Sequence, residues 1–132
     1  MRELKFRAWD KHEKKFIYKF LMSSTDDKDS DDWTCPLTLG EHNGHTEWLN
    51  NDQLIISQYT GLKDKNEKPI YEGDILRYAD TVCVVEFEEK YARFILRDMS
   101  DDFPLSFDAR LLADMEIIGN IHENPELLKE AK

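Results

Sequence analysis

Residues Tyr59–Tyr78 read YTGLKDKNEKPIYEGDILRY, and this stretch combines a strand end, a polar turn and the start of another strand. Gly61 can adopt a positive φ where a strand must turn, because glycine has no Cβ. The segment Asp64–Asn66 supplies side chains that can bond their own backbone and close a tight turn. Gly73-Asp74 then opens the apolar run Ile75-Leu76, which is typical of the start of a barrel strand. We therefore expect a chain that is mainly β.

The rest of the C-terminal half also follows a strand pattern. Five segments separated by short polar turns are predicted strands: Leu54–Tyr59, Asp74–Tyr78, Val82–Glu88, Tyr91–Arg97 and Glu116–Ile121. Five short strands in about 70 residues are typical of a small SH3-like or OB-type barrel. Helical spacing predicts a short helix before the last strand, because apolar residues recur at Phe107, Leu111, Leu112 and Met115. The pair Asn124-Pro125 suits the N-cap and first turn of a C-terminal helix over 126–131.

The N-terminal part predicts a separate β-hairpin subdomain. Apolar and charged residues alternate over 3–8, which is the period of a half-buried strand, and Phe16–Met22 is a second strand after a polar turn. Residues 23–32 are nearly all Ser, Thr and Asp, which indicates a loop, and Asn43-Gly44 favours a second, smaller hairpin. The expected organisation is a hairpin subdomain at 1–22, an acidic, polar insertion at 23–52, an SH3-like β-barrel at 53–121 and a C-terminal helix at 122–132.

Charge and length restrict the kinds of partner. The chain has 132 residues, a length typical of one domain. It has 18 basic and 28 acidic side chains and a net charge of −10. This sign argues against direct binding of nucleic-acid phosphates and against docking on an anionic membrane. No apolar run approaches the ~20 residues of a membrane helix, and no signal peptide is evident. The two cysteines, Cys35 and Cys83, make no disulfide framework, so we expect a reduced cytoplasmic protein of a bacterial host cell.

Three blocks of the chain resemble the YopX family of small phage and prophage proteins. They are FRAWD (6–10), the stretch 59–78 and EIIGNIHENPELL (116–128). The resemblance implies a β-rich fold, an N-terminal β subdomain before an SH3-like barrel, and self-association, but no established function or site residues. Two positions depart from the family pattern. His122 stands where GNIYENPEL has an aromatic residue, and Glu67 stands where the turn KDKNGK has glycine, which questions a glycine-dependent turn there.

The best metal candidate is Cys35, His42 and His45 in the insertion, because thiolate and imidazole are good zinc ligands. Their spacing matches no compact motif such as C-x-x-C or H-E-x-x-H, so polar loop residues around a turn are the plainer interpretation and we expect no cofactor. The chain also lacks a phosphate-binding glycine loop, and adjacent acids such as Glu88-Glu89 suit a solvated face. We therefore expect that the protein is not an enzyme.

Aromatic residues suggest the most plausible function. Trp33 and Trp48 lie in the polar insertion, where a buried core position is least expected, so we expect them to contact a host or phage protein. The leading hypothesis is a non-enzymatic protein-interaction module. The alternative is an acidic mimic of nucleic acid that blocks a host DNA-binding protein, a role that requires carboxylates ordered on one face.

The N-terminal hairpin also predicts self-association. It carries more aromatic side chains than two strands can bury, since an isolated hairpin is marginally stable in water. The residues concerned are Phe6, Trp9, Phe16, Tyr18 and Phe20. They must pack either on the barrel of the same chain or on the hairpin of a neighbour. Together with the family resemblance, this pattern favours a homo-oligomer.

Overall fold

A computed structural model describes residues 3–22, 37–42, 45–49, 54–99, 104–106 and 108–130. The chain divides into two compact units. Unit 1 comprises Met1–Phe6 and Ser57–Lys132, and unit 2 comprises Arg7–Ile56. Most of the predicted barrel and the whole C-terminal segment therefore belong to unit 1. Most of the predicted hairpin subdomain and the whole of the predicted insertion belong to unit 2.

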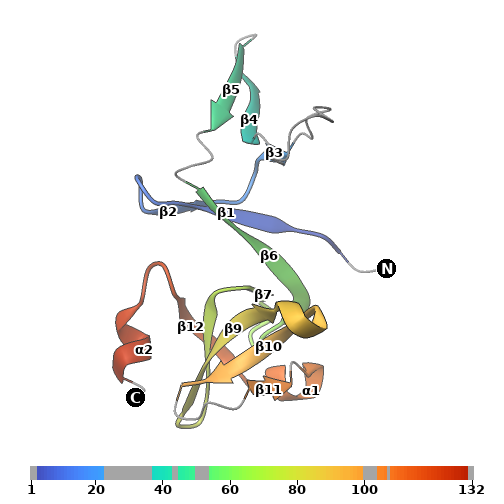
Figure 1. Cartoon of the computed structure of the whole chain (residues 1–132), viewed down its shortest axis with the longest axis vertical. Coiled ribbons are helices and arrows are strands. Elements are labelled where there is room, and N and C mark those ends of the chain that lie inside the picture. The colour runs from blue at the N-terminus through green and yellow to red at the C-terminus, as the bar shows by residue number, and fades with distance from the viewer. Residues whose placement is uncertain are drawn as a thin grey trace. The chain divides into compact units, whose positions relative to one another are not determined.

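Unit 1 is built on an antiparallel sheet with the order β11-β10-β9-β8-β12, which curves into a half-barrel (Figure 1). Its strands are β8 (Asp74–Tyr78), β9 (Thr81–Glu88), β10 (Arg93–Asp98), β11 (Pro104–Ser106) and β12 (Glu116–Asn120). A second antiparallel pair joins β6 (Leu54–Lys63) to β7 (Pro69–Tyr71). The prediction of a mainly β fold is confirmed.

Three short helices accompany the strands in the described part of unit 1. The 3₁₀-helix η2 (Glu89–Tyr91) connects β9 to β10, α1 (Ala109–Leu112) precedes β12, and α2 (Glu126–Glu130) follows it. Asp108 caps α1, because its carboxylate accepts the Arg110 N–H at 2.8 Å. The predicted short helix before the last strand and the predicted C-terminal helix are therefore both present.

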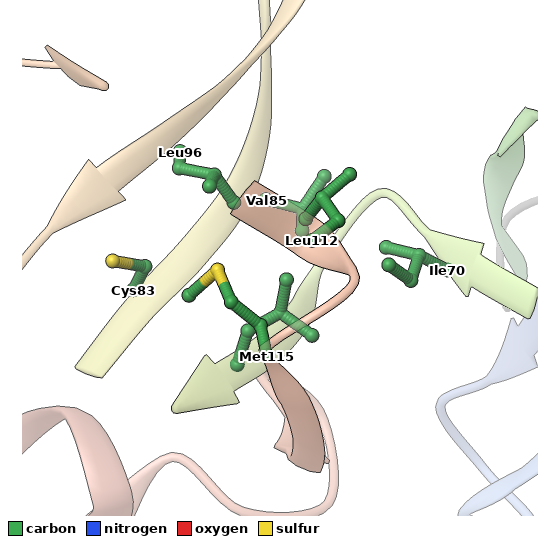
Figure 2. Packing of buried hydrophobic residues seen from close by; sticks show 7 residues of the cluster. Ile70, Cys83, Val85, Leu96, Leu112 and Met115 are labelled. Atoms are coloured by element: carbon green, nitrogen blue, oxygen red, sulfur yellow. The ribbon is translucent and has the colours of Figure 1, made fainter. Parts of the chain in front are cut away.

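The core of unit 1 lies between one face of the sheet and α1 (Figure 2). Its fully enclosed members are Ile70, Leu76, Cys83, Val85, Leu96, Leu112 and Met115. Cys83 and Val85 share this face because alternate residues of a strand point to the same side. Burial raises the pKa of the Cys83 thiol to about 11, and the nearby charge of Asp98 adds to this shift. The thiol is therefore protonated at neutral pH and packs as a small apolar group.

Strand β6 differs from its predicted length. It continues beyond Tyr59 to Lys63, and its pairing with β7 shifts register between these residues. Gly61 lies within the shift at φ 93°, which only glycine adopts without strain. The strand therefore bends at Gly61 and does not end there. The pairing partner β7 was not predicted, because three residues beginning with a proline give little periodic signal.

Unit 2 contains a hairpin and a three-stranded sheet. Strand β1 (Phe6–Asp10) pairs antiparallel with β2 (Lys15–Ile17), and Asp10 closes the turn by accepting the N–H groups of residues 12 and 13. Strands β3 (Leu21–Met22), β4 (Leu37–His42) and β5 (His45–Leu49) form the sheet. The predicted β4–β5 hairpin is therefore present.

The single predicted strand Phe16–Met22 is wrong. The segment divides into β2 and β3, and β3 pairs with β4 and not with β1. Tyr18 and Lys19 are both exposed, so the alternation of buried and exposed residues stops between the two strands. A run of aromatic residues concealed this interruption in the sequence.

Candidate functional site

A pocket of about 200 Å³ lies beside the C-terminal helix of unit 1. It is lined by Glu72, Gly73, Val84, Val85, Glu86, Arg97, Met99, Ile121 and Leu128. These residues come from the turn before β8, from β9, from β10 and the residue after it, from the segment after β12 and from α2. The pocket therefore exists only after the sheet and the C-terminal helix have assembled.

Gly73 joins the parts that form the pocket. Its N–H donates to the Val85 carbonyl at 2.8 Å, and its own carbonyl accepts the Ile121 N–H at 2.9 Å. Its φ is 91°, a conformation that glycine adopts readily. The neighbouring Glu72 N–H donates to the Gln58 carbonyl at 3.0 Å. These bonds hold the Glu72 backbone at the pocket by connecting it to both β6 and β9.

Three charged groups line the otherwise apolar pocket. The Arg97 guanidinium donates from Nε to the Glu86 carboxylate at 2.7 Å, so these two charges largely balance. Burial raises the pKa of the Glu72 carboxyl above its ordinary value of 4.5, and the negative charge of Glu86 raises it further. The charged groups of the pocket lining are therefore two carboxyl groups and one guanidinium group.

A second exposed feature lies where β9 turns through η2 into β10. The rings of Phe87 and Phe94 meet edge to face with centroids 5.3 Å apart, and Phe87 is 42% exposed. Tyr91 is 61% exposed, and the Arg93 guanidinium lies 5.1 Å from its ring centroid. We call Phe87, Tyr91, Arg93 and Phe94 the aromatic tip. Aromatic and arginine side chains of this kind are enriched at protein–protein interfaces.

The backbone of the aromatic tip is held by local contacts. Arg93 also donates to the Glu88 carboxylate at 3.0 Å across the hairpin. Ala92 adopts φ 51°, and its N–H donates to the Glu89 carbonyl at 3.2 Å. Because residues alternate along a strand, the Glu88–Arg93 pair and the Phe87–Phe94 pair lie on opposite faces of the hairpin. The hairpin therefore presents groups from both of its faces.

A family model described as YopX protein matches residues 5–129, nearly the whole chain. The chain belongs to the YopX family. It is also similar to the crystal structure of protein EF1440 from Enterococcus faecalis, with 29% sequence identity and a TM-score of 0.69. That match covers 97% of this chain and 99% of the other. None of the curated proteins matches. The comparisons therefore establish the family and the fold.

Three polar side chains hold the backbone of the YopX-like stretch 59–78 by hydrogen bonds. Asp64 Oδ1 accepts the N–H groups of Asn66 and Lys68 at 2.8 and 2.9 Å, and its Oδ2 accepts the Ile117 N–H of β12 at 3.1 Å. Asp74 Oδ2 accepts the Tyr71 N–H at 2.8 Å, and the Thr60 hydroxyl donates to the carbonyl of residue 70. Each of these side chains is buried, so the block stabilises turns inside unit 1.

The second YopX-like block, around GNIHENP, forms a compact turn before α2. Asn120 Oδ1 accepts the N–H groups of His122 and Glu123 at 3.0 and 2.9 Å. Asn124 Oδ1 accepts the Asn120 N–H at 3.3 Å, and this side chain fills the space next to Gly119. Asn124 precedes α2 as predicted, since its backbone carbonyl accepts the Leu127 N–H at 3.1 Å, while its side-chain oxygen bonds within the turn.

The structure places the five predicted oligomerisation residues as follows. Trp9 is buried, Phe6, Phe16 and Phe20 are half-buried, and Tyr18 is 58% exposed. The Trp9 and Phe16 rings meet edge to face at 4.9 Å, and the Arg7 guanidinium lies 4.1 Å from the Phe16 ring centroid. These contacts show how the hairpin packs part of its own aromatic surface. Self-association remains a prediction.

The candidate residues of the insertion are placed only in part. Trp33 and Cys35 lie outside the described residues, and Trp48 belongs to β5. The backbones of His42 and His45 are cross-strand partners at the end of the β4–β5 hairpin. Among the described residues, no group of three or more possible metal ligands occurs. The contact surface at Trp33 and Trp48 and the metal site therefore remain predictions.

Sequence reasoning did not identify the pocket. Glu72, Glu86 and Arg97 are far apart along the chain, and their proximity depends on the pairing of β9 with β10. One signal was available, because Glu86 interrupts the apolar run of β9 at a half-buried position. None of the helices in the described ranges is long and apolar enough to cross a membrane.

Proposed function

We propose that this YopX-family chain is a non-enzymatic protein-interaction module whose contact surface includes the aromatic tip. The partner is a host or phage protein in the bacterial cytoplasm. The observation that supports this proposal best is the exposure of Phe87 and Tyr91 next to Arg93, on a hairpin whose backbone is held by its own hydrogen bonds. A rigid aromatic group loses little entropy on binding, so such residues often contribute most of the binding energy.

Affinity measurements on a captured partner would test the proposal. The tagged chain is used to capture proteins from a bacterial host lysate, and a captured protein is purified and titrated against three forms of the chain. We expect the double variant Phe87→Ala, Tyr91→Ala to bind at least about tenfold more weakly than wild type, since interface anchors commonly contribute about 2 kcal/mol each.

The matched control is Tyr78→Ala, which removes an exposed aromatic side chain from the end of β8. Its affinity should equal that of wild type. Thermal unfolding of all three forms shows whether the sheet is intact. Unchanged binding by the double variant, or an equal loss in Tyr78→Ala, would contradict a role for the aromatic tip.

The alternative, an acidic mimic of nucleic acid, has less support from the described residues. Glu86 and Glu88 on β9 are each paired with an arginine of β10, so they do not form an unbalanced row of negative charge. The acidic segment 26–32 lies outside the described residues. Binding of a captured partner that is insensitive to salt would count against mimicry.

A further inference from the structure

We propose that the pocket beside α2 receives one uncharged aromatic side chain, a phenylalanine, from a polypeptide partner. This inference rests on the proposed function in one respect, since it assumes that the chain binds polypeptides. It concerns a surface other than the aromatic tip. Glu86 and Arg97, which line the pocket, lie on the face of the β9–β10 hairpin opposite to the Phe87–Phe94 pair, because residues alternate along a strand.

The size of the pocket suits one ring. Pockets for drug-sized ligands and cofactors usually enclose about 300–1,000 Å³. This pocket encloses about 200 Å³. A cavity of about 150 Å³ with an apolar lining is large enough to bind benzene. The pocket therefore has room for a phenyl ring and its methylene group, while the backbone of the partner stays outside.

The charged groups of the lining are already engaged within the chain. Arg97 donates from Nε to the Glu86 carboxylate at 2.7 Å, and Glu72 is not without a partner either. A charged ligand would lose its hydration here without meeting an unpaired counter-ion, which costs free energy. An uncharged ligand has no such loss, so the balance of charge favours a neutral occupant.

The rest of the lining is apolar and comes from separate elements. Val84 is buried on β9, Leu128 is half-buried on α2, and Ile121 is 38% exposed between β12 and α2. An apolar recess beside balanced charges resembles the interface pockets that hold one anchoring side chain of a partner. Closing this recess with a partner would remove the exposed part of Ile121 from water.

Phenylalanine matches this lining better than the other large side chains. It brings no polar atom that needs a hydrogen-bond partner in the pocket, whereas tyrosine and tryptophan each bring one. A flat ring also loses less conformational freedom on binding than a long flexible side chain does. Met99 adds a thioether, a group that makes favourable contacts with aromatic rings.

Titration of short peptides, followed by NMR, would test this inference on the full chain. The probe is a blocked pentapeptide with the sequence Ala-Ser-Phe-Ser-Ala, and its two counterparts carry alanine or lysine at the central position. We expect the phenylalanine peptide to bind with a millimolar dissociation constant and to shift the resonances of Gly73, Ile121 and Leu128. Each counterpart should bind at least about tenfold more weakly.

Contacts between peptide and protein give a direct measurement that needs no variant. Nuclear Overhauser effects should connect the ring protons of the bound peptide to the methyl groups of Val84, Ile121 and Leu128. These effects should be absent with the alanine peptide, which has no ring.

A matched pair of variants on α2 tests whether the pocket wall is responsible. Leu128→Ala removes part of the wall and should weaken binding of the phenylalanine peptide at least about threefold. Leu127→Ala is the control, because Leu127 is also half-buried on α2 but does not line the pocket. Its affinity should equal that of wild type. Thermal unfolding of both variants shows whether the sheet is intact.

Four results would overturn the inference. They are the absence of resonance shifts up to about 5 mM peptide, equal binding of either counterpart, an equal loss of affinity in both leucine variants, and ring contacts confined to the aromatic tip. The last result would support the aromatic tip and reject the pocket, so the two proposals fail separately. Benzyl alcohol distinguishes a free small molecule from a polypeptide. If it binds as tightly as the peptide, the proposed polypeptide partner is wrong.

Discussion

Asp64 is only 3% exposed, and its two carboxylate oxygens accept three backbone N–H groups. Two of these groups belong to its own turn and the third to β12. Burial by itself raises the pKa of Asp64, but the three hydrogen bonds and the charge of Lys68 outweigh it, so that the pKa lies below its ordinary value of 3.8. The ionised carboxylate is therefore part of the fold of unit 1.

Replacing Asp64 with asparagine should destabilise the chain by about 2–3 kcal/mol at neutral pH, because an amide replaces a charged acceptor and turns an N–H toward a backbone donor. Because the pKa of Asp64 is lower in the folded chain than in the unfolded chain, its ionised carboxylate stabilises the fold at pH values above the unfolded pKa. This contribution is lost as the pH falls through the pKa of the folded chain. The difference between wild type and Asp64→Asn should therefore shrink as the pH falls below 3.8.

Urea denaturation of both forms from about pH 7 to about pH 2 measures this difference. Asp114→Asn is the control, since Asp114 is exposed and lies two residues before β12, the strand that Asp64 contacts through Ile117. It should change stability by less than about 0.5 kcal/mol. A difference between wild type and Asp64→Asn that stays constant over the whole pH range would contradict the proposed role of the charge.

Glu67 stands where the resemblance to the YopX family leads us to expect glycine, and it adopts φ 63°. A residue with a Cβ is strained in this region by about 1–2 kcal/mol. Glu67→Gly should therefore raise the free energy of unfolding by about 0.5–1 kcal/mol, after allowing for the extra freedom of glycine in the unfolded chain. Glu67→Ala removes the same charge but keeps the Cβ, so it should give no gain in chemical denaturation. Equal effects of the two variants would show that charge, and not backbone strain, decides stability here.

At the scale of elements, the turn between β12 and α2 depends on a close approach of Gly119 to Asn124. A Cβ built on Gly119 would lie 2.5 Å from Asn124 Oδ1 and 2.8 Å from its Cγ. The same Asn124 oxygen accepts the Asn120 N–H. Glycine is therefore required at this position for space.

Gly119→Ala should lower the free energy of unfolding by about 1–3 kcal/mol, because the added methyl group forces the turn to move. Asn124→Ala removes the obstructing side chain and its hydrogen bond, at a cost of about 1 kcal/mol. The double variant should be less destabilised than the sum of the two single variants, since the clash is then absent. Thermal or urea unfolding of the four forms measures this coupling. Simple additivity would argue against a direct clash.

At the scale of the whole molecule, the described hairpin of unit 2 leaves part of its aromatic surface uncovered. Unit 1 has an enclosed core of seven residues around α1. In unit 2, Tyr18 is exposed, and Phe16 and Phe20 are only half-buried. A second copy of the chain would cover this aromatic surface, as the predicted homo-oligomer requires.

Light scattering at micromolar concentration should therefore give a mass that is a multiple of the mass of one chain. Tyr18→Glu should shift the population toward the monomer, because it places a charge in the shared surface. Its control, Tyr78→Glu, changes an exposed tyrosine of unit 1 and should leave the mass unchanged. A wild-type chain that is already a monomer would show that the hairpin is not an assembly surface.

The sequence by itself determined the features that depend on neighbouring residues. Ile75-Leu76 marks the buried start of β8, Gly61 marks the bend in β6, and the helical spacing that includes Leu111 marks α1, because each signal depends on residues close together in the sequence. These features establish a mainly β chain. The division of Phe16–Met22 into two strands was missed, since the pairing of β3 with β4 joins segments that are far apart in the chain.

Only the tertiary structure decided which distant residues meet. The Asp64 carboxylate bonds to Ile117, 53 residues away, and the pocket joins Glu72 to Glu86 and Arg97 through the register of the sheet. A shift of one residue in that register would place Glu86 and Arg97 on opposite faces of the sheet. Local patterns contain no information about such a choice. The register is selected by the burial of the whole core, and the candidate site is a consequence of that selection.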